Sequence, residues 1–235
     1  MIFITGDTHG GFKRLAKFAQ KMNTTKDDVM IILGDAGLNY FVTDTDSEYS
    51  IKIKDEVANI PLTFFCIHGN HEERPYNVKG YEVSQFFGAD VWVNPKYPNQ
   101  IFAKDGEIYD IAGLKTIVIG GAYSVDKWIR LGRGGGWWES EQPTDEIKHY
   151  VESQLDKNNW KVDVVLSHTC PLDTEPVHLF LPFVDQDSVD KSTEEWLQTI
   201  ANKLDYKKWW FGHFHGDWVN GKYEMLFESV KEFGL

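Results

Sequence analysis

Short apolar runs that end in glycine next to aspartate, asparagine or histidine constrain the fold of this chain more than any other feature. The run Ile2–Thr5 is followed by Gly6-Asp7-Thr8-His9, and the run Val29–Leu33 is followed by Gly34-Asp35. Between them, apolar residues at three- and four-residue spacing predict a helix over 12–22. Because apolar runs without alternation suit strands that are covered on both faces, this order of strand, helix and strand indicates a parallel sheet between helices.

The same order continues along much of the chain. Further strands are predicted over 62–67, 162–166 and 207–211, and further helices over 48–59, 143–155 and 192–204. Each of these strands is also followed by groups that can bind a metal ion: Asn70 and His71, His168, and His213 and His215. The alternation favours an α/β fold in which the strand ends carry the chemistry.

Two stretches depart from this order. After Phe86 the predicted strands become short, and Lys104-Asp105-Gly106 predicts a hairpin between two of them, so we expect an antiparallel meander there. Residues 120–138 contain too much glycine for a helix and too many aromatic residues for a linker. Because the sequence shows no repeat and no linker, we interpret residues 1–235 as a single domain.

The charge balance excludes whole classes of partner. Lys and Arg total 24 while Asp and Glu total 36, which gives a formal net charge of -12. A protein of that charge repels polyanions and anionic membrane surfaces. The two cysteines cannot build a disulfide framework, no secretion leader is apparent, and no apolar run approaches the ~20 residues of a membrane helix. We therefore expect a cytoplasmic protein that binds neither membranes nor long nucleic acids.

The polar groups at the strand ends are expected to meet in space, because the carboxyl ends of strands in an open α/β sheet form the edge where ligands bind. The set comprises imidazoles, carboxylates and one amide, which suits Mn, Fe, Zn or Ni better than a structural cysteine zinc site. Any one of these residues could instead cap a helix or close a turn. Turn chemistry does not require histidine, however, and five of the eight histidines fall in these motifs.

Five motifs follow one another along the chain: Gly-Asp-Thr-His-Gly at 6–10, Gly-Asp at 34–35, Gly-Asn-His-Glu at 69–72, Ser-His at 167–168 and Gly-His-Phe-His at 212–215. In this order they resemble the motifs of the calcineurin-like metallophosphoesterase superfamily. The resemblance spans residues 5–216 and implies a four-layer αββα sandwich. In such a sandwich two mixed β-sheets are flanked by helices, the metal site lies at the C-terminal strand ends, and the meander would fit the second sheet.

The resemblance also implies a binuclear metal centre held by seven residues. Asp7, His9 and His215 would bind one divalent ion, Asn70, His168 and His213 would bind the other, and Asp35 would bridge both. Mn is the expected metal, with Fe, Zn or Ni as alternatives. Two such ions outweigh the charge of the carboxylates, so the site would attract a phosphate although the whole protein is acidic.

His71 is implied to be catalytic rather than a ligand. It would protonate the leaving alkoxide or stabilise charge on the phosphoryl oxygens; a supporting contact to Asp7 is the alternative and is compatible with that role. Within residues 120–138, Lys127, Arg130 and Arg133 are candidates for binding the substrate phosphate or a carboxylate, beside tryptophans that offer flat faces. An aromatic cluster that only pins the loop explains the same residues equally well.

At two positions the sequence departs from motifs of particular branches of the superfamily, which argues against a protein phosphatase and against a tyrosinate-iron site. The motif at Gly34-Asp35 lacks the Asp-Arg pair of the protein serine/threonine phosphatases, and Leu38 stands where purple acid phosphatases have a tyrosine ligand.

We therefore expect a metal-dependent phosphoesterase, a phosphatase or phosphodiesterase, that hydrolyses a small phosphomonoester or phosphodiester, nucleotide-like substrates included, by attack of a metal-bridging hydroxide. A non-catalytic metal-binding scaffold of the same fold and a nuclease are the alternatives. The complete ligand set argues against the scaffold, and the acidic surface argues against the nuclease.

Overall fold

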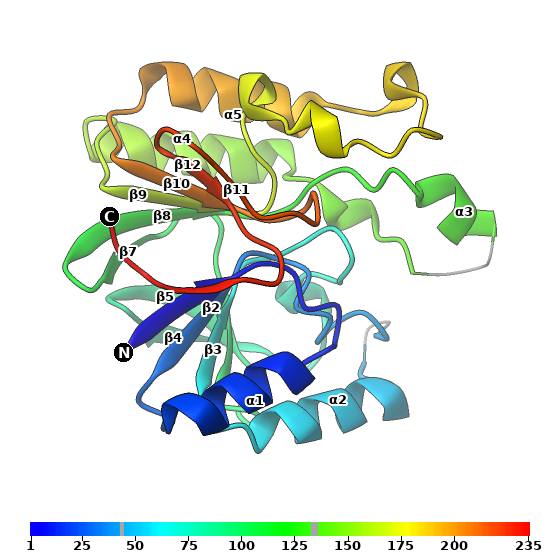
Figure 1. Ribbon diagram of the computed structural model, residues 1–235, viewed down its shortest axis with the longest axis vertical. Coiled ribbons are helices and arrows are strands. Elements are labelled where there is room, and N and C mark those ends of the chain that lie inside the picture. The colour runs from blue at the N-terminus through cyan, green and yellow to red at the C-terminus, as the bar shows by residue number, and fades with distance from the viewer. Residues whose placement is uncertain (43–44, 133–135) are drawn as a thin grey trace.

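Two β-sheets stacked face to face, each covered by helices on its outer side, form the four layers of the fold (Figure 1). The computed structural model describes residues 1–42, 45–132 and 136–235. Helices α1 (Lys13–Met22) and α2 (Glu48–Ala58) cover the first sheet, and α4 (Asp145–Lys157) and α5 (Ser192–Lys203) cover the second. The predicted αββα sandwich of two mixed sheets is confirmed.

The first sheet has seven strands in the order β13-β1-β2-β3-β6-β5-β4. Their bounds are β1 Ile2–Thr5, β2 Val29–Ile32, β3 Thr63–Cys66, β4 Glu82–Phe86, β5 Ala89–Val93, β6 Gln100–Ala103 and β13 Val230–Glu232. Strands β1, β2, β3 and β6 run parallel, whereas β13 and β5 join them antiparallel and β4 pairs antiparallel with β5.

The second sheet has six strands in the order β11-β12-β10-β9-β8-β7. Their bounds are β7 Ile108–Ile111, β8 Leu114–Ile119, β9 Val164–Ser167, β10 Lys208–Phe211, β11 Trp218–Asn220 and β12 Tyr223–Met225. The four inner strands run parallel, and the outer strands β11 and β7 pair antiparallel with their neighbours. The carboxyl ends of the central strands of both sheets therefore open on the same side of the molecule (Figure 1).

Alternating side chains on the central strands build three apolar layers. Trp209 of β10 packs toward α4 and α5, together with Trp196, whereas the next residue, Trp210, packs between the sheets with Ile4. A third layer lies between the first sheet and α1 and α2, and includes Phe64. Because both faces of each sheet are covered, the central strands are held rigidly and their ends are fixed relative to one another.

The meander expected after Phe86 is divided between the two sheets. Strands β4, β5 and β6 extend the first sheet, so only β7 and β8 lie in the second. The hairpin predicted at Lys104-Asp105-Gly106 is wrong, because the chain crosses there from β6 in one sheet to β7 in the other. A turn signal reports that the chain changes direction, but long-range packing decides which strands pair.

The segment 120–138 also differs from its prediction, since it contains a short helix, α3 (Lys127–Gly132). Glycine does not prevent this helix because the one glycine in it, Gly132, is its last residue. The described residues also form five 3₁₀ turns: Pro75–Asn77, Glu139–Glu141, Leu172–Thr174, Val177–Leu179 and Gln186–Ser188.

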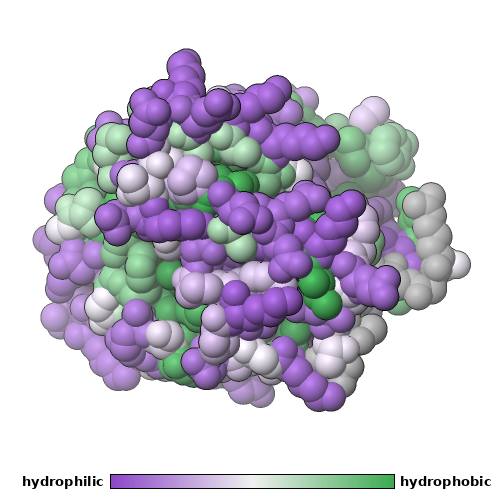
Figure 2. Space-filling model, turned by 90° about the horizontal axis from the view of Figure 1, so that it is seen from below, coloured by the Kyte–Doolittle hydropathy of each residue, from purple (hydrophilic) through white to green (hydrophobic). Residues whose placement is uncertain are grey.

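Within the described ranges, none of the helices combines the length and the apolar character needed to cross a membrane. The face seen from below, where α1 and α2 lie, is mostly hydrophilic with apolar residues scattered over it (Figure 2).

Candidate metal centre

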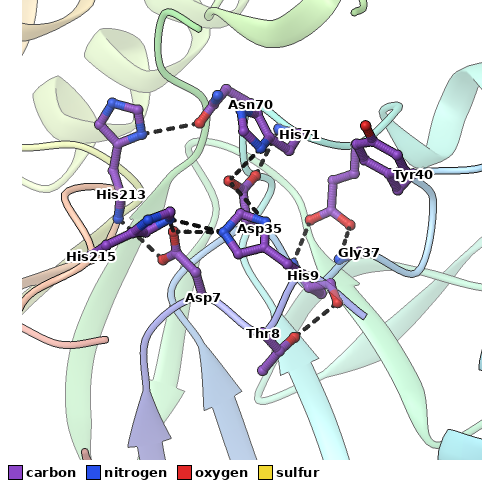
Figure 3. Close-up of polar contacts among 12 residues, drawn as sticks. Asp7, Thr8, His9, Asp35, Gly37, Tyr40, Asn70, His71, His213 and His215 are labelled. Atoms are coloured by element: carbon purple, nitrogen blue, oxygen red, sulfur yellow. Dashed lines mark hydrogen bonds and ion pairs between the residues drawn. The ribbon is translucent and has the colours of Figure 1, made fainter. Parts of the chain in front are cut away.

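The polar residues at the ends of β1, β2, β3 and β10 come together (Figure 3), and His168 at the end of β9 joins them through its contact with Asn70. The structure brings all seven proposed ligands and His71 into this cluster, although they come from both sheets and span Asp7 to His215 in the chain. Three overlapping groups in it have the spacing of metal ligands: Asp7, His9 and His215; His9, Asp35 and His71; and Asp7, Asp35 and His168.

The first group surrounds the carboxylate of Asp7. Asp7 Oδ2 lies 3.3 Å from His215 Nε2 and 3.7 Å from His9 Nε2, and the two ring nitrogens lie 2.9 Å from each other. Asp7 Oδ2 is buried and has no hydrogen-bond partner among the described residues. An unpartnered buried carboxylate oxygen beside two facing imidazoles is the arrangement that a bound cation would satisfy.

Another group, which is not one of these three, surrounds Asn70 Oδ1, which lies 2.8 Å from His168 Nε2 and 3.0 Å from His213 Nδ1. Asp35 connects the two groups, because its Oδ2 lies 3.6 Å from His168 Nε2 and 3.9 Å from His9 Nδ1. The seven residues therefore fit two ions that share Asp35, and this donor set of imidazole, carboxylate and amide suits a divalent transition metal.

Three glycines that directly precede proposed ligands leave space for the side chains of proposed ligands from other strands. A Cβ at Gly34 would lie 2.0 Å from His168 Nδ1, and one at Gly69 would lie 2.0 Å from Asp35 Oδ1. A Cβ at Gly212 would lie 2.4 Å from Asp7 Oδ1. Each of these three glycines thus precedes one proposed ligand in sequence and lies against a second one in space, which explains why these motifs pair glycine with a donor.

The backbone is strained at four of the site residues. His9, Asp35, His213 and His215 all have positive φ angles, between 47° and 69°. Residues other than glycine rarely adopt this left-handed conformation, and it persists where the surrounding structure enforces it, often at functional sites. These four left-handed residues contribute side chains to both groups, His9 and His215 at Asp7 and His213 at Asn70.

The two aspartates of the cluster favour positive charge at His168. Burial lowers the pKa of His168, but the carboxylates of Asp35 and Asp7 outweigh it and raise the pKa to about 9. Burial likewise raises the pKa of Asp35, yet the neighbouring imidazoles hold it well below its usual value. A centre that retains a proton so strongly in its interior is suited to bind a cation in the same place.

Two supporting residues, Ser124 and Glu72, were not identified from the sequence. Asn70 Nδ2 donates to Ser124 Oγ over 2.8 Å, so Oδ1 of the same amide is directed at the histidines. The Glu72 carboxylate is fully buried and accepts from the backbone N–H groups of Ala36 and Gly37, directly after Asp35. The signal for Glu72 was its place in Gly-Asn-His-Glu, whereas Ser124 lies in an irregular segment with no pattern of its own.

Arg130 and His71 lie together at the edge of the cluster. The Arg130 guanidinium lies 3.1 Å from His71 Nδ1 and 3.2 Å from Nε2. It also donates to Asp126 Oδ1 over 2.8 Å and to the Tyr40 hydroxyl over 2.8 Å. These contacts fix the guanidinium beside His71.

The other two candidates from segment 120–138 are placed differently. The Lys127 ammonium lies over the ring of Trp137, 4.2 Å from its centroid, so the structure places Lys127 in an aromatic cluster. Arg133 lies outside the described residues.

The comparison with known families identifies the fold. Residues 1–217 match the family model described as calcineurin-like phosphoesterase. The chain belongs to the calcineurin-like phosphoesterases. In this calcineurin-like phosphoesterase, the matched region includes every strand end that contributes to the metal centre.

Two solved structures illustrate what this calcineurin-like phosphoesterase is similar to. One is the crystal structure of TT1561 from Thermus thermophilus, at 11% identity and a TM-score of 0.49, with 96% of this chain and 87% of that chain covered. The other has 13% identity, a TM-score of 0.48 and coverage of 96% and 88%. No curated protein matched the sequence.

Proposed function

We propose that this protein is a di-metal phosphoesterase that hydrolyses a small phosphomonoester or phosphodiester. The observation that carries the proposal is the position of Asp35, whose Oδ2 lies between the group around Asp7 and the group around Asn70. One carboxylate can thus serve both ions, and Mn is the metal we propose to load first.

Two divalent ions bound there would supply an activated water and neutralise charge on the phosphoryl oxygens. The seven ligand residues would hold the ions at fixed positions, because their backbone is anchored at the ends of central strands. The unpartnered Asp7 Oδ2 and the raised pKa of His168 both support a cation at this place.

His71 is the residue we propose to act on the ester directly. Its side chain is half-buried, its Nδ1 lies 3.8 Å from Asp35 Oδ2, and its backbone N–H donates to Asp35 Oδ1 over 2.7 Å. Burial lowers the pKa of His71, and Asp35 only partly opposes this. A neutral ring donates a hydrogen bond to a phosphoryl oxygen, and an imidazolium favoured by the bound anion would donate its proton to the leaving alkoxide.

Arg130 would orient the phosphoryl group. Its contacts with Asp126 and Tyr40 fix the guanidinium beside His71 before any substrate binds, which lowers the entropy cost of binding. Arg130 would thereby take the part that the missing Asp-Arg pair plays in the protein phosphatases, at a different position in the chain.

The test is hydrolysis of an aryl phosphomonoester and an aryl phosphodiester by Mn-loaded protein. We expect turnover of at least one of them, with about two metal ions bound per chain, and loss of turnover in Asp35→Asn and His71→Ala. Asp35→Asn keeps a residue that tolerates the positive φ at this position. Two bound metals without turnover above these variants would instead support a non-catalytic scaffold.

A further inference from the structure

A pocket of about 430 Å³ opens beside the metal centre. Part of its lining belongs to the centre itself, including Asp35, Asn70 and His71. The opposite wall is apolar and comes mostly from the loop between β9 and α5: Leu179, Phe180, Leu181, Val184 and Val189. The pocket is therefore continuous with the place where a phosphoryl group would bind.

The apolar wall is attached to the metal-binding motif. Phe214 stands between the proposed ligands His213 and His215, and its ring stacks with that of Phe180 at 6.1 Å and an interplanar angle of 19°. Leu181 is 47% exposed within the same wall. Apolar side chains exposed in a concave site gain free energy when an apolar group covers them.

The charges around the pocket disfavour a second anion. Among the described residues that line it, none is lysine or arginine, whereas Asp126, Glu175 and Glu194 are acidic, in addition to the proposed ligand Asp35. The cations that bond these carboxylates are Arg130, which donates to Asp126 over 2.8 Å and is assigned to the phosphoryl group, and Lys191, which donates to Glu175 over 2.7 Å. Among the described residues that line the pocket, a carboxylate or a further phosphate on the substrate would find no lysine or arginine as a partner.

We propose that this pocket binds the organic group of the phosphate ester and selects an uncharged aryl or alkyl group. The inference rests on the proposed function and deepens it by naming the substrate class. Polyphosphorylated nucleotides and esters that carry a carboxylate in the organic group are poor substrates on this account. Selection then depends on the loop between β9 and α5 as well as on residues 123–126.

The experiment measures binding of three phosphonates to Mn-loaded protein by calorimetry: phenylphosphonate, methylphosphonate and 4-carboxyphenylphosphonate. All three carry the same group for the metals and differ only in the organic part. We expect phenylphosphonate to bind about tenfold more tightly than methylphosphonate, because burial of a ring contributes at least that much. We expect 4-carboxyphenylphosphonate to bind no more tightly than methylphosphonate.

A pair of variants locates the selection in the pocket. Val184→Lys places a cation in the lining, whereas Phe183→Lys places the same charge on the neighbouring residue, which is 79% exposed and outside the pocket lining. Val184→Lys is expected to weaken the binding of phenylphosphonate and to tighten the binding of 4-carboxyphenylphosphonate about tenfold. Phe183→Lys is expected to leave the order unchanged. Metal content and melting temperature show that both variants fold.

Equal binding of phenylphosphonate and methylphosphonate, or identical behaviour of the two lysine variants, would overturn the inference while leaving turnover of aryl esters intact. Absence of both turnover and phosphonate binding would overturn the proposed function, and the inference with it. Turnover and selective binding are separate readouts, so the two failures are distinguishable.

Discussion

The side-chain amide of Asn70 donates to the hydroxyl of Ser124 over 2.8 Å, and both residues are buried. This contact uses the amide nitrogen, so the amide oxygen is the atom that faces His168 and His213. Ser124 thus positions a proposed ligand without itself contacting the metal.

Ser124→Ala is expected to weaken binding of one of the two ions by about 10- to 100-fold, the usual effect of removing a partner that orients a ligand. Calorimetric titration of metal-free protein with Mn measures the affinity for each ion. The control is Ser153→Ala, since the Ser153 hydroxyl bonds to its own helix at the Tyr150 carbonyl. If Ser124→Ala binds both ions as tightly as the wild type does, Ser124 does not orient the amide.

Gly34→Ala is expected to abolish binding of the ion that His168 would hold, because the new Cβ would overlap the His168 ring. The control is Gly113→Ala, which has a similarly positive φ of 78° but no atom within 4 Å of the added Cβ. Both substitutions strain the backbone by about 1 kcal/mol, and only the first should change the metal content. If both variants retain two ions, the overlap between the new Cβ and the His168 ring does not prevent metal binding.

Arg130→Gln is expected to raise KM for an aryl phosphate about tenfold or more, since a guanidinium held by Asp126 and Tyr40 would no longer bind the phosphoryl oxygens. Lys127→Gln should change KM by less than about threefold, because its ammonium lies over Trp137. Steady-state kinetics at constant metal occupancy compares the two. A larger effect at Lys127 would mean that the aromatic cluster opens toward the substrate.

Glu194 is expected to make the stability of the protein depend on pH. Burial raises its pKa to about 7 from an ordinary value of 4.5. Between pH 4.5 and pH 7 the folded protein therefore keeps a proton that the unfolded chain has lost, so the free energy of unfolding falls as the pH rises through this window.

Glu194→Gln should remove this dependence. The free energy of unfolding of the variant, relative to that of the wild type, should therefore rise by roughly 3 kcal/mol between about pH 4 and about pH 8. Urea unfolding at the two pH values measures the change. Glu195→Gln, on the exposed neighbour, is the control for loss of one negative charge. If the free energy of unfolding changes with pH by the same amount in the wild type and in Glu194→Gln, Glu194 is not the source of the pH dependence.

Much of the metal centre was predictable because its determinants are local. Each proposed ligand lies within a few residues of the end of an apolar strand, and parallel strands bring their carboxyl ends to one edge. The glycine beside a donor, as in Gly34-Asp35, is visible in the sequence, although its reason, the ring of His168, is visible only in space.

The tertiary structure decided the contacts between distant residues, which local sequence patterns do not contain. The sheet to which β4, β5 and β6 belong, the contact of Ser124 with Asn70 and the approach of Arg130 to His71 all join residues far apart in the chain. The apolar wall around Phe180 comes from a loop without periodicity, and its place beside the metal centre depends on its packing against Phe214. The sequence alone therefore determined the donors and their order along the chain, whereas long-range packing determined which side chains orient them and what surrounds the substrate.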